Sequence, residues 1–236
     1  MPCFLLFSPI HTYLPIPHTM NNTETTALIV IDVQNDFASE EGSLFVSGGP
    51  ATVPNINEIM EHEFFAAKNP IIATQDWHPT NHCSFVSNHE GAQLFSLKTL
   101  PNGIEQVMWP VHCVQNTKGS EYHPDLNLPT NTIHVKKGTL SDIDSYSAFF
   151  DNARANATPL HGILTDLNVK KVICVGIATD YCVKFSALDA VSLGYETHLI
   201  LNCVAGVAED STNTALEELK EKGVIIHENF DMFINE

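Results

Sequence analysis

The sequence has few positive charges. Of its 236 residues only 11 are Lys or Arg, against 28 Asp or Glu, so the formal net charge at pH 7 is −17. A surface of this sign repels nucleic-acid phosphates and anionic lipid headgroups. We therefore expect neither a nucleic acid nor a membrane as a partner.

The sequence also lacks long apolar runs and a basic N-terminal region. No run approaches the ~20 apolar residues of a membrane-spanning helix. No Lys or Arg precedes Lys68, and prolines interrupt the apolar segment 1–18, so a secretory signal peptide is not indicated. We expect residues 1–24 to be a disordered extension, residues 25–236 to form a single domain, and the protein to be cytoplasmic.

Paired cysteines and nucleotide-binding glycine motifs are absent too. The six cysteines include no Cys-x-x-Cys pair, which argues against a zinc ribbon or a thioredoxin-type motif. Thiols this scattered also argue against a disulfide framework and favour a reducing compartment. There is no Gly-x-Gly-x-x-Gly and no Walker loop, so no nucleotide cradle is indicated.

What the sequence does contain is an alternation of short β-branched runs and helical patterns. Such alternation predicts an α/β fold with a doubly wound, mostly parallel six-stranded sheet and helices on both faces. The predicted strands are residues 27–31, 70–74, 132–135, 171–177, 197–201 and 224–227. The predicted helices are residues 53–67, 159–168, 180–193 and 211–222. Between them, residues 76–129 show no clear period, and a loop this long in a compact domain is usually functional or disordered.

Reactive side chains follow several of the predicted strands. Ligands of open α/β sheets bind beyond the carboxyl ends of the strands, so these side chains should meet at one edge. They are Asp32, Asp76, His78, Lys136, Lys137 and Cys182.

Cys182 lies where a strand turns into a helix. There the helix macrodipole favours a thiolate, and the small residues Gly176 and Ala178 would let a carbonyl approach backbone N–H groups. A small buried hydrophobe is the competing interpretation. Lys137 needs a partner if it ends a buried strand, and Asp32 is the natural one. The pair is either a structural ion pair or, with Cys182, a catalytic triad; Lys136 competes with Lys137.

Asp76 and His78 predict a metal site. At positions i and i+2 of an extended segment they point to one side, and a carboxylate with two imidazoles suits a transition metal. His112 and His82 are the candidates for the further ligand. An Asp-x-His pair by itself more often lies on a surface.

Several motifs, in register from about residue 27 to 228, together resemble the nicotinamidases, a branch of the isochorismatase-like cysteine hydrolases. They are residues 32–37, 75–79, 109–116, 137–138 and 176–183, and residues 144–152 are also similar to this branch. The resemblance implies a catalytic triad, ligands for one divalent metal, ring-flanking residues and oxyanion donors. The triad is Asp32, Lys137 and Cys182, and the metal ligands are Asp76, His78 and His112. The ring-flanking residues are Phe37, Trp109 and Tyr146, and the oxyanion donors are the N–H groups of Ala178 and Cys182.

The resemblance further implies a reaction and a cofactor. Cys182 would attack the carboxamide of nicotinamide, ammonia would leave, and water would hydrolyse the thioester to nicotinate, in NAD salvage. Zinc is the expected metal, with iron or manganese as alternatives. His82 matches a position that supplies a further ligand in some relatives. The peptide between residues 177 and 178 is cis in relatives. Whether the chain forms a homo-oligomer is left open.

Two alternative functions stand beside this one. A related amidase would act on a carbamoyl or ureido substrate, and an inactive relative would bind a metabolite or a partner protein. One departure from the shortest relatives is a longer segment at residues 87–108. We expect this insert to alter the lid over the pocket but to touch none of the predicted site residues.

Overall fold

The computed structural model describes residues 25–66 and 69–235. The predicted disorder of residues 1–24 lies outside these ranges, and the first strand begins where that extension was expected to end. Within the described ranges, no helix combines the length and the apolar character needed to cross a membrane.

Six parallel strands form the central sheet, which confirms the predicted fold class. Their order is β5-β2-β1-β6-β7-β8. The strands are β1 (Thr25–Ile31), β2 (Ile71–Asp76), β5 (Ile133–Lys137), β6 (Val169–Ile177), β7 (Glu196–Ala205) and β8 (Ile225–His227). From β1 the chain adds strands first on one side and then, from β6 onward, on the other. The order reverses between β1 and β6, which is where ligands of such sheets bind.

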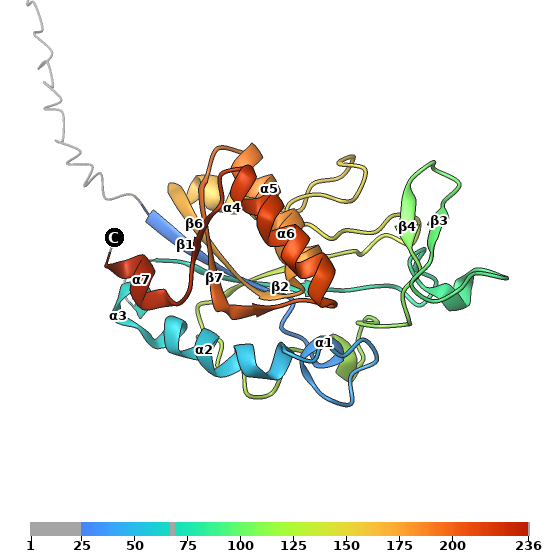
Figure 1. The fold of residues 1–236 in the computed structure, drawn as a ribbon, viewed down its shortest axis with the longest axis horizontal. Helices are drawn as coiled ribbons and strands as arrows, with labels where there is room; N and C mark the ends of the chain where they lie inside the picture. The colour runs from blue at the N-terminus through green and yellow to red at the C-terminus, as the bar shows by residue number, and fades with distance from the viewer. Residues whose placement is uncertain (1–24, 67–68, 236) are drawn as a thin grey trace, which may run out of the picture.

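Helices cover both faces of this sheet because its central strands are apolar on both sides (Figure 1). In β1, Leu28 and Val30 face one core, and Ala27, Ile29 and Ile31 face the other. The first core is closed by α2 (Gly49–Glu61), α3 (Glu63–Ala66) and α7 (Phe230–Ile234). The second is closed by α4 (Leu160–Asp166), α5 (Lys184–Ser192) and α6 (Glu209–Glu221).

The helix boundaries differ from the predicted ones in instructive ways. The predicted helix 53–67 begins earlier, at Gly49, and breaks at the extended residue His62. The predicted helix 180–193 opens with a wide π-helical turn, Thr179–Val183, before α5 begins. This turn contains Cys182 and lies at the carboxyl edge, so the irregularity falls at a chemically interesting position.

The long aperiodic stretch contains structure that its sequence did not indicate. Strands β3 (Leu97–Thr99) and β4 (Glu105–Val107) pair as an antiparallel hairpin. In Figure 1 this hairpin extends from the side of the molecule, away from the central sheet. The strands have three residues each, too few for a period of two to stand out from the loop around them.

Candidate active site and metal centre

The carboxyl ends of three strands bring the predicted triad together. Asp32 directly follows β1, Lys137 ends β5, and Cys182 lies in the turn after β6. The Nζ atom of Lys137 is 2.9 Å from Asp32 Oδ2 and 3.3 Å from Cys182 Sγ. A side-chain oxygen of Asp32 lies within 4.8 Å of Cys182 Sγ. The three predicted groups therefore meet as the strand order suggested.

Lys137 is the centre of this arrangement. Its side chain is fully buried, and Nζ donates to Asp76 Oδ1 at 2.5 Å and to the Ser145 carbonyl at 2.9 Å. Burial opposes the charge, but the carboxylates of Asp32 and Asp76 outweigh it and raise the pKa of Lys137 well above its usual value. Breaking such a buried pair typically costs about 3–5 kcal/mol. The competing lysine, Lys136, instead lies over the Trp77 ring, outside the cluster.

The two carboxylates that flank Lys137 differ in their proton affinity. Lys137, together with His78 and His112, overcomes the penalty of burial and lowers the pKa of Asp76. Burial raises the pKa of Asp32, and the negative charge of Asp76 adds to that effect against the attraction of Lys137. Asp32 is therefore the carboxylate better suited to accept and return a proton.

Thr74 holds Asp32 in place, a role that the sequence did not reveal. Asp32 has a left-handed backbone with φ +50°. The Thr74 hydroxyl donates to Asp32 Oδ1 at 2.6 Å and accepts from the Asp32 N–H at 3.2 Å. The hydroxyl thus fixes both the backbone and the carboxylate of this residue. Its only sequence signal is its place two residues before Asp76 on a predicted strand.

Gln34 holds the backbone of Asp76 in place. Its buried side chain accepts from the Asp76 N–H at 2.8 Å and donates to the Asp76 carbonyl at 2.9 Å. A second bond from Gln34 Nε2 reaches the Ser120 carbonyl. A glutamine that satisfies the strand end in this way fixes the direction of the carboxylate beyond it.

The turn that carries Cys182 depends on Gly176. Its φ is +115°, and a Cβ there would lie 2.1 Å from the Ile31 carbonyl oxygen. The following peptide, between Ile177 and Ala178, is cis, as the resemblance implied. Burial raises the pKa of the Cys182 thiol well above its usual value, against the attraction of Lys137, and this direction opposes the thiolate preference expected from the helix start. A nearby base that accepts the thiol proton would offset this effect of burial.

The three predicted metal ligands point their free nitrogens and oxygens toward one place. One ligand atom from each of Asp76, His78 and His112 lies within 4.8 Å of the others. The Nε2 atoms of the two histidines are 3.6 and 4.0 Å from Asp76 Oδ2. A carboxylate with two imidazoles is a common donor set for zinc and other transition metals.

Hydrogen bonds to the far side of each ring fix which nitrogen is free. Nδ1 of His78 lies 2.8 Å from the Gly138 carbonyl, and Nδ1 of His112 lies 2.8 Å from the Pro110 carbonyl. A carbonyl can only accept, so each Nδ1 carries a proton, and in the neutral rings the Nε2 lone pairs face the cluster. His78 Nε2 is buried without a hydrogen-bond partner among the described residues. These residues fit a metal ion.

His82 is an additional candidate that the structure brings close. Its ring stacks on His78 with centroids 4.0 Å apart, and its buried Nε2 has no hydrogen-bond partner within residues 25–66 and 69–235. Asp144 is the nearest acid, 3.9 Å away. Burial lowers the pKa of His82 to about 4, which keeps the ring neutral and able to coordinate.

A narrow cavity lies beside the thiol and the ligand cluster. Phe37, Trp109, Tyr146 and Ala178 line it together with Cys182, so the residues expected to flank a ring surround one space. Its volume is about 30 Å³, which suits a water molecule. Entry of an aromatic substrate therefore requires the side chains at the rim to move apart.

The insert at residues 87–108 does touch predicted site residues, which corrects the expectation from the sequence. The Gln106 amide donates to the Tyr146 hydroxyl at 3.0 Å, and the Phe95 ring meets Trp109 edge-on at 5.9 Å. The expectation failed because a loop without periodicity gives no information about what it packs against.

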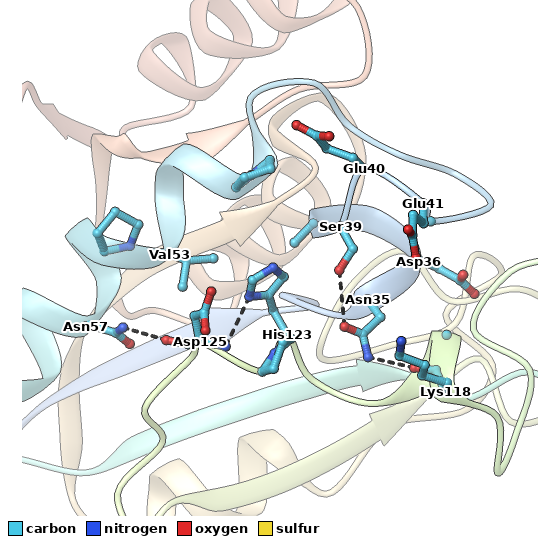
Figure 2. A pocket seen from close by; sticks show the side chains of 16 residues that line it. Asn35, Asp36, Ser39, Glu40, Glu41, Val53, Asn57, Lys118, His123 and Asp125 are labelled. Carbon is cyan, nitrogen blue, oxygen red and sulfur yellow. Dashed lines mark hydrogen bonds between the residues drawn. The ribbon is translucent and has the colours of Figure 1, made fainter.

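A larger hollow of about 720 Å³ lies elsewhere, between α1 (Asn35–Ala38), α2 and residues 118–125 (Figure 2). None of the predicted site residues lines it. Some polar side chains on its wall are engaged in local bonds, such as Asn35 to the Lys118 carbonyl and Asn57 to the Asp125 carbonyl. The predicted nucleophile Cys182 and the predicted ligands Asp76 and His112 line the narrow cavity instead.

An α/β sheet with a cysteine, an acid and a lysine at its carboxyl edge defines a cysteine hydrolase. The isochorismatase domain model matches residues 26–229, so the chain belongs to the isochorismatase family. A nicotinamidase of Acinetobacter baylyi is 43% identical over 206 residues, covering 87% of this chain and 93% of that protein.

Two solved structures share this fold at appreciable identity. The yeast nicotinamidase bound to the inhibitor nicotinaldehyde has a TM-score of 0.81 and 34% identity, covering 86% of this chain and 99% of that one. A pyrazinamidase of Pyrococcus horikoshii in complex with zinc has a TM-score of 0.71 and 37% identity, covering 86% and 98%.

Proposed function

We propose that the chain is an amidohydrolase that converts nicotinamide to nicotinate and ammonia, with a divalent metal ion as cofactor. The observation that carries this function is the contact of a buried Lys137 with Cys182 Sγ, 3.3 Å away, beside the Asp76–His78–His112 cluster. Similarity to nicotinamidases along most of the chain supports the same substrate. The nicotinate formed serves NAD salvage.

Cys182 is the nucleophile and Asp32 moves the proton. As Sγ bonds to the carboxamide carbon, the thiol proton passes to Asp32, whose raised pKa suits it to hold that proton. Asp32 then protonates the nitrogen, the C–N bond breaks, and ammonia leaves a thioester. A water molecule attacks the thioester and gives one proton to Asp32, which passes it to the sulfur as the C–S bond breaks. The acid formed leaves as nicotinate and gives its remaining proton to solvent or to ammonia.

Lys137 and the backbone stabilise the charges that arise. The ammonium group keeps its proton throughout and faces the sulfur as the sulfur becomes negative. The N–H groups of Ala178 and Cys182 are the oxyanion donors, and both residues line the cavity. Phe37, Trp109 and Tyr146 provide the apolar walls against which a flat ring packs.

Asp76, His78 and His112 hold the metal ion, which we propose to be zinc. Buried charge supports a cation here, because two carboxylates face a single ammonium group. The zinc-bound relative supports the choice of ion. When bound, the ion supplies Lewis-acid chemistry, orienting a ring nitrogen or activating a water.

The test is product analysis with the purified chain. Nicotinamide is supplied to the metal-loaded protein, and nicotinate and ammonia are quantified together. Equal amounts of the two products support the function. If the folded, metal-loaded protein leaves nicotinamide intact but hydrolyses a ureido or carbamoyl compound, the function belongs to the alternative amidase.

A further inference from the structure

Gln106 lies outside the central sheet yet is among the most buried polar residues. It belongs to β4 of the hairpin, where it pairs with Lys98 of β3, and it is 1% exposed. A buried amide is costly unless its hydrogen bonds are made. The bonds of this residue therefore indicate what it is for.

These bonds connect the hairpin to the wall of the cavity. The two hydrogens of Gln106 Nε2 are shared among three acceptors: the Tyr146 hydroxyl at 3.0 Å, Asp144 Oδ2 at 2.9 Å and the neighbouring Val107 carbonyl. Its Oε1 accepts from Asn152 Nδ2 at 3.4 Å. Asp144 and Tyr146 both line the cavity, whereas Gln106 does not.

The Tyr146 hydroxyl is shared between two walls. Trp109 Nε1 also donates to this oxygen, at 3.1 Å. A phenol oxygen has two acceptor positions at most, and the amide and the indole take both. The distance between the Trp109 and Tyr146 side chains, and hence the width of the ring slot, is therefore set partly by Gln106.

We propose that Gln106 is a positioning residue for substrate, which fixes the ring slot by orienting the Tyr146 hydroxyl against the Trp109 indole. The inference rests on the proposed function, since the slot is where the pyridine ring of nicotinamide binds. Gln106 touches neither the substrate nor the reacting atoms. It acts on ring binding in the ground state and the transition state alike, so its effect falls on KM rather than kcat.

The experiment compares Gln106→Met with a matched substitution, Gln93→Met, on an exposed part of the same insert. Methionine keeps the length of the side chain and removes its hydrogen bonds. We expect Gln106→Met to raise KM for nicotinamide about tenfold with kcat within about threefold. Gln93→Met should leave both values unchanged. A wild-type KM in a folded Gln106→Met protein would overturn the inference.

Tyr146→Phe tests the same link without risk to the hairpin, because it removes one hydroxyl. It should raise KM by a similar factor, and Gln106→Met should then add about twofold or less in the Tyr146→Phe background. An unchanged KM in Tyr146→Phe overturns the inference even if Gln106→Met does not fold. An undiminished effect in the double variant also overturns it, because Gln106 would then act through Asp144.

A readout without turnover separates this inference from the proposed function. The indole N–H resonance of Trp109 reports on the shared hydroxyl, so it should shift in Gln106→Met and not in Gln93→Met. If the wild-type protein does not hydrolyse nicotinamide but the resonance shifts in Gln106→Met, the proposed function is refuted and the effect of Gln106 on the shared hydroxyl stands. An unmoved resonance in active protein would refute the positioning role alone.

Discussion

Two clusters in this molecule combine lysine, acid and buried histidine, and they differ in where the histidine lone pairs point. The carboxyl-edge cluster consists of Asp32, Asp76, His78, His112 and Lys137. The β7–β8 cluster consists of Lys171, Glu196, His198 and His227. In the carboxyl-edge cluster both rings bond a carbonyl through Nδ1 and turn Nε2 inward. In the β7–β8 cluster His198 meets the other ring at 2.9 Å and Glu196 at 3.0 Å.

Burial alone does not mark a histidine as a metal ligand. His78 and His198 are both nearly inaccessible, at 0% and 3%. Both nitrogens of His198 are used by protein groups, whereas Nε2 of His78 is left for something else. A metal site is thus recognised by unsatisfied, converging donor atoms.

The largest expected difference between the clusters concerns their lysines. Lys137→Met leaves two buried carboxylates without a cation and removes the charge beside the thiol. We expect nicotinamide turnover to fall about a hundredfold or more and the free energy of unfolding to fall by about 3–5 kcal/mol. Lys171→Met breaks a half-exposed pair with Glu196, worth about 1 kcal/mol at most. Steady-state kinetics measure the turnover of both variants, and denaturant unfolding measures their stability. Equal losses in the two variants would contradict the difference between the two lysines.

The histidines should differ in metal content. His78→Ala removes one of three converging ligands, so metal per chain after dialysis should drop far below that of the wild type. The His198→Ala protein should keep the same metal content as the wild type and lose only stability, because the partners of His198 are protein groups. Elemental analysis of the two purified variants gives the answer. Retention of metal by folded His78→Ala would remove that residue from the ligand set.

Two glycines with a left-handed backbone, Gly138 and Gly194, differ in whether they lie against a predicted metal ligand. Gly138 has φ +61°, and a Cβ there would lie 2.3 Å from Cε1 of the His78 ring. Gly194 has φ +90° and open space around the same position. Both changes to Ala incur a backbone cost of about 1–2 kcal/mol, because an L-residue is placed in the left-handed region. Only Gly138→Ala should also weaken metal affinity, by about tenfold or more, as measured by competition with a chelator.

The smallest expected effect is a pH dependence of stability in the β7–β8 cluster. Burial, helped by the neighbouring ring, lowers the pKa of His198 below its ordinary 6.5. The unfolded chain therefore binds the proton more readily, and the stability contributed by neutral His198 is lost as the pH falls below about 6.5. His198→Asn should show a smaller drop in Tm between neutral and mildly acidic pH than the wild type. An identical drop would mean that His198 does not titrate differently on folding.

The sheet and the meeting of Asp32, Lys137 and Cys182 at its edge were predictable because their signals are local. Continuous β-branched runs mark strands buried on both faces, and parallel strands bring residues such as Asp32 and Lys137 to one edge regardless of the loops between them. The Asp76–His78 pair needed only the period of an extended chain. The third ligand needed the resemblance, since His112 and His82 could not be separated by spacing.

The supporting residues were not predictable, because their partners are distant in sequence. Thr74 and Gln34 contact residues across neighbouring strands, and Gln106 contacts a tyrosine 40 positions away. The upward shift of the Cys182 pKa also escaped prediction. The helix start argued for a thiolate, but the extent of burial and the nearness of two carboxylates are properties of the folded chain.

The most direct test of the central claim follows the acyl group itself. Wild-type protein is acid-quenched during nicotinamide turnover, its peptides are analysed by mass spectrometry, and Cys182→Ala is assayed in parallel for ammonia release. The account predicts a nicotinoyl group on the peptide that contains Cys182 and no turnover by the folded, metal-loaded Cys182→Ala protein. Ammonia release by that variant at the wild-type rate would contradict it.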